Sequence, residues 1–154
     1  MALVTGQRLT ADLLNSYLVT NIGNSVIVSN SATTSGTTET VTLSVTGNLV
    51  AGQLYQIQFV GRIASSVLTG DLVNFRIRED NLTGAQQGFG VLATASNSTT
   101  NGYTTICLAQ YTAASTASKT FVFTLQRPAT GSGNFTVISS SSAPSFFTIS
   151  LMPS

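Results

Sequence analysis

The chain has 154 residues, of which 42% are hydrophobic and only 7% are charged, with a formal net charge of +1 and no histidine. This length is typical of one domain, and the apolar content is enough for a buried core, which argues against a disordered chain. The missing histidine removes the commonest general base and the commonest metal ligand, and six basic residues are too few to neutralise several phosphates. Composition therefore disfavours an enzyme and a nucleic-acid-binding protein.

Residues 6–15 (GQRLTADLLN) have the features of a short capped helix. Thr10 is a suitable N-cap, Asp12 lies in the first turn where the helix dipole favours a negative charge, and Gly23 is expected to end the helix. A helix of two or three turns is marginal in water, so its apolar face needs a partner surface, either another protein or the chain's own sandwich. The side chains assigned to this docking surface are Arg8, Leu9, Leu13, Leu14, Tyr17 and Leu18.

After Gly23 the sequence alternates between apolar and polar residues with the period of β-strands. Within 54–63, Tyr55 and Phe59 are expected to face the core, and Gln56 to face the other way. Strands are expected at 25–29, 38–46, 54–63, 72–78, 103–110, 120–126, 134–139 and 146–151. Turns or loops are expected at 46–48, 69–71, 84–90, 97–102, 128–133 and 139–142.

Eight strands that each have one polar face predict an all-β fold, a single eight-stranded antiparallel β-sandwich of the jelly-roll type. We assign residues 24–154 to this sandwich and residues 1–23, with the short helix, to an N-terminal anchor segment. An immunoglobulin-like sandwich is the alternative topology. Against it, the chain has no tryptophan and no pair of cysteines that could link two sheets.

Charged residues are unevenly spread along the chain. None lies between Asp12 and Glu39, none between Asp80 and Lys119, and none after Arg127. Monomeric domains usually keep a well-charged surface, so these gaps favour a surface that other subunits cover. The alternative is that serine, threonine, asparagine and glutamine side chains hydrate the surface alone.

Two arginines stand out because they alternate along one strand. Arg76 and Arg78 flank Ile77 and are expected on one strand face, and Glu79 and Asp80 follow them directly. We therefore expect a local ion-pair cluster formed by these four charged residues. Adjacent strand residues point to opposite faces, so the two carboxylates make a poor acid–base pair.

No catalytic, cofactor-binding or metal-binding residue is assigned. Asp71 beside Gly70 could join a calcium site, but a carboxylate in this position more often forms an Asx turn. Cys107 lies in an apolar strand and is expected to be a small buried hydrophobe without a disulfide. No secretion signal and no apolar run of membrane-spanning length is visible. These features predict assembly in a reducing cytoplasm, with no membrane partner.

Residues 10–15 (TADLLN) resemble the T-A-x-x-L-N element near the N-terminus of many small virion proteins of tailed bacteriophages, where it precedes a β-rich domain. Those proteins often carry a tryptophan and a more charged continuation, where this chain has Tyr17 and the uncharged residues 18–21. Residues 52–55, 70–71 and 76–78 (GQLY, GD and RIR) are similar to the strand pair of phage jelly-roll fibre and head-decoration domains. Together these resemblances cover about a third of the chain.

The resemblance implies a non-enzymatic structural protein on the virion surface, assembled in the host cytoplasm. One compact domain without a shaft favours a capsid decoration or head-fibre protein over a tail fibre. Such a protein is expected to form a homotrimer through its sandwich. It would dock on the major capsid protein, or on another virion protein, through the docking surface of the anchor segment, with three anchors acting together.

Two other classes remain as alternatives. The first is a minor tail or receptor-binding module that binds a host-surface glycan, with Phe89, Tyr103 and Tyr111 as the aromatic rings on which sugars would stack. Tryptophan, the best residue for such stacking, is missing. The second is a trimeric signalling ligand similar to tumour necrosis factor, which would share the fold but would need a secretion signal or a membrane anchor.

Overall fold

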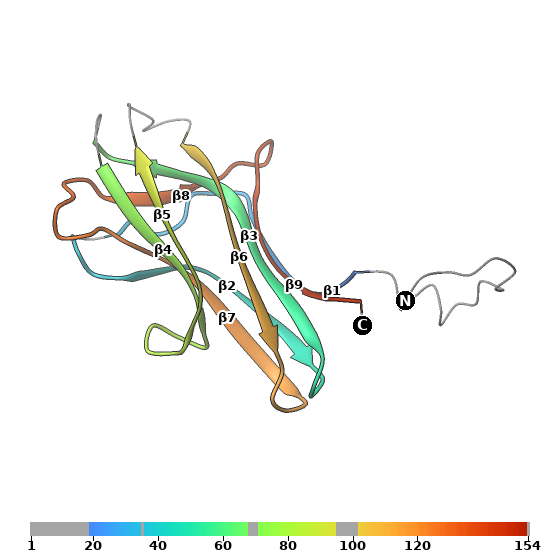
Figure 1. Cartoon of the computed structure of the whole chain (residues 1–154). Coiled ribbons are helices and arrows are strands. Elements are labelled where there is room, and N and C mark those ends of the chain that lie inside the picture. The colour runs from blue at the N-terminus through green and yellow to red at the C-terminus, as the bar shows by residue number, and fades with distance from the viewer. Residues whose placement is uncertain (1–18, 35, 68–70, 95–101, 154) are drawn as a thin grey trace, which may run out of the picture.

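The computed structural model describes residues 19–34, 36–67, 71–94 and 102–153, and these residues fold into two antiparallel sheets packed face to face (Figure 1). This confirms the prediction of an all-β sandwich. The described residues contain nine strands, one more than expected. Their bounds are β1 (Thr20–Ile27), β2 (Thr40–Leu49), β3 (Leu54–Ser65), β4 (Asp71–Glu79), β5 (Gln86–Thr94), β6 (Tyr103–Thr112), β7 (Ala117–Gln126), β8 (Phe135–Ile138) and β9 (Ser145–Leu151).

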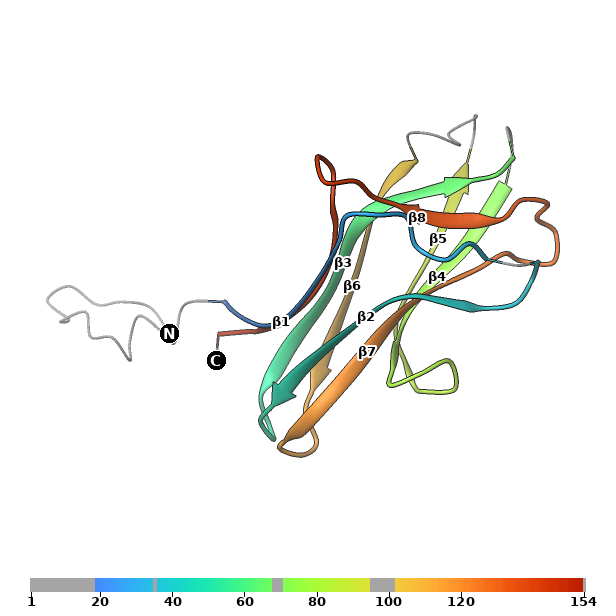
Figure 2. The same cartoon turned by 180° about the vertical axis from the view of Figure 1, so that it is seen from behind.

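The order of the strands is that of a jelly roll. One sheet, called the β3 sheet below, has the order β1-β9-β3-β6, with β8 paired to the end of β3. The other, the β7 sheet, has the order β2-β7-β4-β5. The first four strands alternate between the two sheets, and each sheet brings together strands that are distant in sequence (Figure 2). This connectivity agrees with the jelly-roll prediction.

Aromatic rings fill the space between the two sheets. Phe59 of β3 stacks on Phe123 of β7 with ring centroids 3.8 Å apart, and both are fully buried. Phe75 and Phe147 lie 6.1 and 6.2 Å from the same Phe123 ring. The inward side chains of β3 are those that its alternating pattern predicted.

The strand β5 was missed, because residues 84–90 were expected to form a loop. Gly88 and Gly90 suggested a turn, but both lie inside β5. A side chain at Gly90 would overlap the ring of Phe75, and a Cβ at Gly88 would lie 3.2 Å from the carbonyl oxygen of Leu108. These glycines reflect close packing across the sandwich, a reason that cannot be read from a local pattern.

Two other glycines also lie inside strands. The turn expected at 46–48 falls within β2, and Gly23, expected to end the helix, falls within β1. A Cβ at Gly23 would lie 2.8 Å from the carbonyl oxygen of Thr46, and one at Gly47 would lie 3.3 Å from that of Ile22. The two glycines therefore let β1 and β2 approach closely.

The sandwich begins closer to the N-terminus than the predicted boundary at residue 24. Because β1 begins at Thr20, residues 20–23 belong to the β3 sheet and not to a helix. The rest of the predicted helix lies outside the described residues. No helix in the described part of the chain is long and apolar enough to span a membrane.

The structure confirms the prediction that Cys107 is a small buried residue. It is 3% exposed and belongs to the core between the two sheets. Burial raises the pKa of its thiol to about 11.

We predict that native Cys107 reacts with iodoacetamide at least about 100-fold more slowly than Cys107 of the urea-unfolded chain. A rise in pKa from 9.0 to about 11 lowers the thiolate fraction by about that factor, and burial blocks access as well. Mass spectrometry of samples taken over time at mildly alkaline pH measures both rates. Equal rates would show that β6 opens readily.

Candidate functional site

An apolar row crosses the outer face of the β3 sheet. Strand pairing places Val26 of β1 opposite Phe146 of β9, Phe146 opposite Val60 of β3, and Val60 opposite Ile106 of β6. Directly opposite residues on one sheet face have neighbouring Cβ atoms, so these four side chains are continuous. Val26, Phe146 and Ile106 are between 39% and 56% exposed, and Val60 is half-buried.

The rest of this face is mostly polar and almost uncharged. A second row, next to the apolar row, consists of Asn24, Thr148, Gln58 and Leu108. The strands β1, β6, β8 and β9 contain no charged residue, and β3 contains only Arg62. A face this wide with a single charged residue is unusual for a surface that stays in water.

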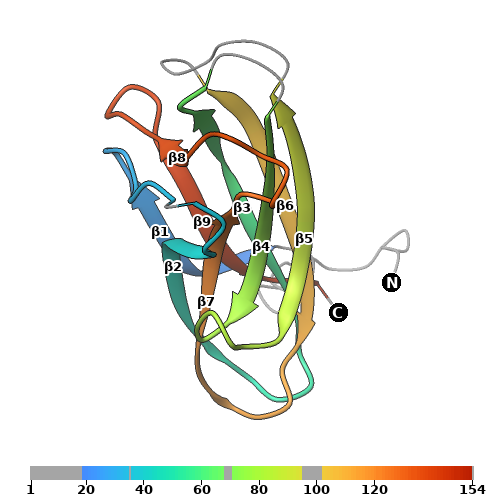
Figure 3. The same ribbon diagram turned by 90° about the vertical axis from the view of Figure 1, so that its left-hand side faces the viewer.

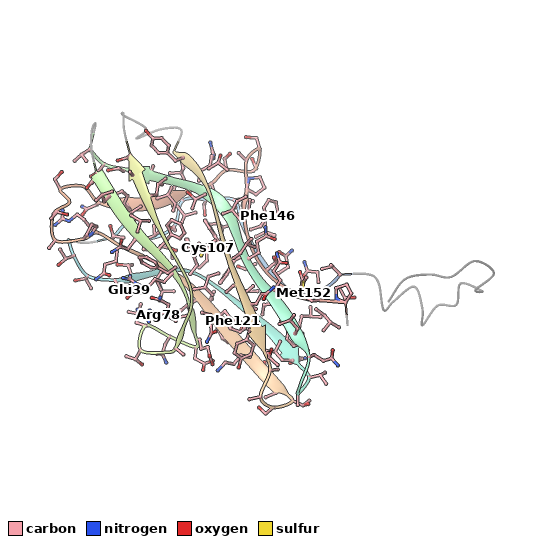
Figure 4. The ribbon with its side chains drawn as sticks, viewed as in Figure 1. Glu39, Arg78, Cys107, Phe121, Phe146 and Met152 are labelled. Carbon is pink, nitrogen blue, oxygen red and sulfur yellow. The ribbon has the colours of Figure 1, made fainter. Side chains whose placement is uncertain are left out.

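Charged side chains gather instead on the β7 sheet and the segments next to it. Figure 4 shows Glu39 and Arg78 on one side of the sandwich and Phe146 on the other. The ion-paired residues on the β7 side are Glu39, Arg76, Arg78, Glu79, Asp80 and Lys119. The two outer faces of the sandwich therefore differ in chemistry.

Arg76 and Arg78 share a strand face, as predicted, but the expected partner was wrong. Arg78 donates from Nε and Nη2 to the two carboxylate oxygens of Glu39 at 2.8 and 3.0 Å, and Arg76 lies 3.6 Å from Glu39. Glu79 and Asp80 pair with Lys119 instead. Glu39 precedes β2, which lies beyond β7, so only the strand order could reveal this partner.

The hydrogen bonds and charges around Glu39 make part of the stability of the fold sensitive to acid. Burial alone would raise the pKa of Glu39, but hydrogen bonds from Arg78 and Thr124 and the charge of Arg76 outweigh it and lower the pKa below 4.5. A carboxyl group with a lowered folded-state pKa stabilises the fold at pH values above its unfolded-state pKa. This contribution is lost as the pH falls through the folded-state value.

We predict that Glu39→Gln lowers the free energy of unfolding by about 2 kcal/mol at pH 7, because it leaves Arg78 without its charged partner. Below pH 4.5 the difference from the wild type is expected to shrink, because the wild-type carboxyl then becomes protonated. Urea titrations at pH 7 and pH 3 measure this. A difference that stays constant between the two pH values would contradict the role given to the ion pairs.

Asp71 is buried and fastens a loop. Its carboxylate accepts hydrogen bonds from the backbone N–H groups of Gly133 at 2.7 Å and Ser132 at 3.2 Å. It also accepts from the N–H of Leu72 at 3.0 Å and from the hydroxyl of Ser65 at 3.3 Å. The described residues contain no group of three or more histidine, cysteine, aspartate or glutamate residues that could hold a metal ion. The carboxylate thus joins the loop between β7 and β8 to the start of β4.

The three aromatic residues suggested for glycan binding do not lie together. Phe89 is exposed on β5, with the Arg76 guanidinium 5.4 Å from its ring centroid. Tyr103 and Tyr111 lie near opposite ends of β6, and Tyr111 packs edge-on against Phe121 at 5.1 Å. The structure therefore gives no shared platform for a sugar.

A polar cavity of about 400 Å³ lies between β8, the end of β3 and the segment before β2. None of the described residues that line it is aromatic. Its side chains already bond to each other and to the backbone: Thr33 pairs with Thr136, and Ser31 accepts the N–H of Val137. The lining residues are Asn30, Ser31, Thr33, Ala64, Ser65, Ser66, Asn134, Thr136 and Ile138.

The predicted docking residues Arg8, Leu9, Leu13, Leu14, Tyr17 and Leu18 lie outside the described residues. The apolar row was not predicted. The sequence feature that could have indicated this row is a strand with apolar residues on both faces, as at residues 106–108 and 146–147. That feature does not show that four such positions align across one sheet.

No family model and no curated protein matches the chain. One similar structure is the Clostridium thermocellum xylanase 10B fragment with CBM22-1 and GH10 modules, complexed with xylohexaose, at 14% identity and a TM-score of 0.38. The match covers 70% of this chain and 19% of that one, so the chain spans about a fifth of its length.

Two further structures are similar over most of both chains. Eiger TNF from S. frugiperda is 12% identical, with 87% of this chain and 92% of that chain covered and a TM-score of 0.47. A CBM4 structure is 12% identical, with 82% and 77% covered and a TM-score of 0.23. At these identities the likeness concerns the fold alone, which is a two-sheet antiparallel β-sandwich.

Proposed function

We propose that this chain is a non-enzymatic structural protein of a tailed-phage virion, a capsid decoration or head-fibre protein on the virion surface. It trimerises through its β-sandwich and docks through its N-terminal segment on the major capsid protein or another virion protein. The observation that carries the proposal is the contrast between the two outer faces. The β7 side holds the ion-paired residues, and the β3 face holds an apolar row and a single charged residue.

This contrast favours assembly because a contiguous exposed apolar surface is costly in water and marks a contact site. Copies of the chain that cover this face would remove it from water without having to pair buried charges. A surface of this kind serves a protein that exists in many copies on a lattice. An active site, by contrast, needs titratable groups in a cleft.

The resemblance of residues 10–15 to a virion-protein element points to a phage particle as the other partner. These residues precede β1, which is an edge strand of the β3 sheet, so the anchor segment joins the sandwich at a sheet edge. Three such segments in one trimer would bind a particle together, and the second and third contacts would then be intramolecular.

The test is a co-sedimentation assay with purified phage heads that lack decoration proteins. The full chain is compared with a variant lacking residues 1–18 and with the full-length double variant Leu13→Ser, Leu14→Ser. We expect the full chain to sediment with the heads and both variants to stay in the supernatant while keeping the oligomeric mass of the full chain.

Two results would contradict the proposal. If the full chain does not bind heads but binds phage tails or a glycan array, the chain is a minor tail or receptor-binding module. If all three proteins bind heads equally, the anchor segment is not the docking element.

A further inference from the structure

We infer that three copies of this chain turn the outer faces of their β3 sheets toward one common axis, so that their apolar rows form a buried apolar layer around it. This inference rests on the trimer of the proposed function and names the surface that forms it. The partner that covers the face is therefore a second and a third copy of the chain. The composition of the face, the order of its rows and its width each support this arrangement.

The apolar side chains form one continuous strip on a single face. Val26, Phe146, Val60 and Ile106 lie side by side from β1 to β6. Leu108, two residues after Ile106, adds an apolar side chain to the same face. Apart from the half-buried Val60, these side chains are between 39% and 56% exposed. A contact that covers this strip gains the free energy of removing apolar surface from water.

The low charge of the face suits a contact between identical copies. A surface that meets its own copy brings like charges together, so a charged face would repel itself. Among the strands of the β3 sheet, only β3 contains a charged residue, Arg62. Arg62 pairs with Thr104 and Ile138 in the row next to the apolar row, on the side of β8. The three Arg62 residues would thus lie at one end of the apolar layer and not within it.

The order of the rows decides the direction of the axis. Beyond the apolar row, on the side away from Arg62, lie two rows with amide and hydroxyl side chains: Asn24, Thr148 and Gln58, and then Asn21, Ser150, Gln56 and Gln110. Rotation about an axis parallel to the strands keeps each row at its level, so apolar rows meet apolar rows and polar rows meet polar rows. Amide and hydroxyl groups both donate and accept hydrogen bonds, so such groups can pair with their own kind. An axis across the strands would reverse the order and set the charged row of Arg62 against the uncharged row of Gln58, which is costly.

The width of the face fits three copies. Four strands about 4.8 Å apart make a face about 20 Å wide. Three faces of this width around an axis form a three-sided prism in which each sheet lies about 6 Å from the axis. Packed sheets are about 10 Å apart, so side chains fill about 5 Å in front of a sheet. Phe146 and Val60, on the two middle strands β9 and β3, would therefore fill the centre, whereas four copies would leave an open channel.

This arrangement brings different edge strands of neighbouring copies together. β1 and β6 are the edge strands of the β3 sheet and lie on opposite sides of the sandwich (Figure 3). In a closed ring, β6 of each copy meets β1 of the next copy at the corner between two faces. Val26 and Ile106 belong to the same row, so they lie at the same level along the axis. Val26 of one copy would therefore lie next to Ile106 of the next copy, and not next to another Val26.

The first test is the mass of full-length glutamate variants by light scattering, after circular dichroism has shown that each is folded. Phe146→Glu places a charge in the middle of the face, and Ile106→Glu places one on its edge strand. Val91→Glu is the matched control, because Val91 is 52% and Ile106 56% exposed, and Val91 lies on an edge strand of the other sheet, opposite Asn74. We expect the wild type and the control to be trimers. Both face variants should be monomers, with association weakened by more than about 100-fold because the contact would bury an unpaired charge.

The second test is disulfide cross-linking, which does not depend on weakening the trimer. The double variant Val26→Cys, Ile106→Cys is compared with the two single variants after mild oxidation, by denaturing electrophoresis without reductant. The native Cys107 is 3% exposed and is not expected to react. We expect the double variant to give a covalent trimer, because position 26 of each copy reaches position 106 of the next. The single variants should remain single chains.

Four results would overturn the inference. If the wild type is a trimer but the face variants stay trimeric, or the double cysteine variant is not cross-linked, the trimer of the proposed function stands and uses another surface. If a single cysteine variant is cross-linked, like strands meet and the axis does not run along the strands. If the wild type is a dimer and the double variant gives a covalent dimer, two faces pack directly and the trimer fails as well. If the wild type is a monomer, both fail, and the head-binding assay alone then decides whether the docking claim survives.

Discussion

Asp71→Ala is expected to lower the free energy of unfolding by about 3 kcal/mol, equivalent to a fall in Tm of about 10 °C for a chain of this size. The substitution leaves the backbone N–H groups of Ser132 and Gly133 without an acceptor, and the carboxylate that they bind is 1% exposed. A buried donor that loses its partner costs its full desolvation penalty. The loop between β7 and β8 is therefore expected to detach from the start of β4.

Thermal unfolding at one fixed protein concentration measures this effect, since association also shifts Tm. The matched control is Asp80→Asn, because the Asp80 side chain is 54% exposed and its ion pair with Lys119 is expected to contribute less than about 1 kcal/mol. Asparagine also tolerates the positive φ of 58° at this position, where alanine would add backbone strain. Asp71→Asn should fall between the wild type and Asp71→Ala. It keeps one acceptor oxygen but turns an amide N–H₂ group toward backbone donors. Equal Tm values for Asp71→Ala and Asp80→Asn would contradict the role of Asp71.

Phe123→Ala is expected to destabilise the protein by about 4 kcal/mol, a large fraction of the stability of a domain. The Phe123 ring is fully buried at the centre of the sandwich, where it stacks on Phe59 and lies within 6.2 Å of the Phe75 and Phe147 ring centroids. Its removal would leave a cavity that rings from both sheets border. The backbone of two hydrogen-bonded sheets cannot collapse into such a cavity without breaking pairs.

Urea unfolding followed by circular dichroism measures the loss, with Leu82→Ala as a control at an exposed residue. We expect Leu82→Ala to lie within about 0.5 kcal/mol of the wild type. A loss below about 1 kcal/mol for Phe123→Ala would mean that the two sheets are not packed through this ring.

Much of the fold could be predicted from the sequence wherever one strand face is buried and the other is solvated. The alternation in residues 54–63 gave the core-facing side of β3 correctly, and the single Cys107 was correctly predicted to be buried. In such strands the period of two is imposed by burial itself, so the local pattern contains the information.

Prediction failed where the residue type at a position is determined by a contact with a residue distant in the sequence. Gly23, Gly47, Gly88 and Gly90 all suggest turns locally, but all four lie in strands, close to atoms of other strands or to the ring of Phe75. The partner of Arg78 was missed for a similar reason. Glu39 is 39 residues away, and only the strand order brings it near.

The candidate site was the hardest part to predict, because it depends on register. No local signal distinguishes Val26, Val60, Ile106 and Phe146 from core residues, because each lies in a strand with apolar side chains on both faces. The charge gaps favoured a surface that other subunits cover, and this stays a prediction. The structure adds that the strands of one sheet contain a single charged residue, Arg62.

The most direct test of the proposed assembly is the mass of the full chain in solution, measured by sedimentation equilibrium over a wide range of protein concentrations. If the chain is a trimer, it is expected to sediment as a single species with three times the 16.0 kDa mass of the chain, stable to dilution into the low micromolar range. A species of 16.0 kDa at every concentration would contradict it, because the apolar row would then face water in a monomer.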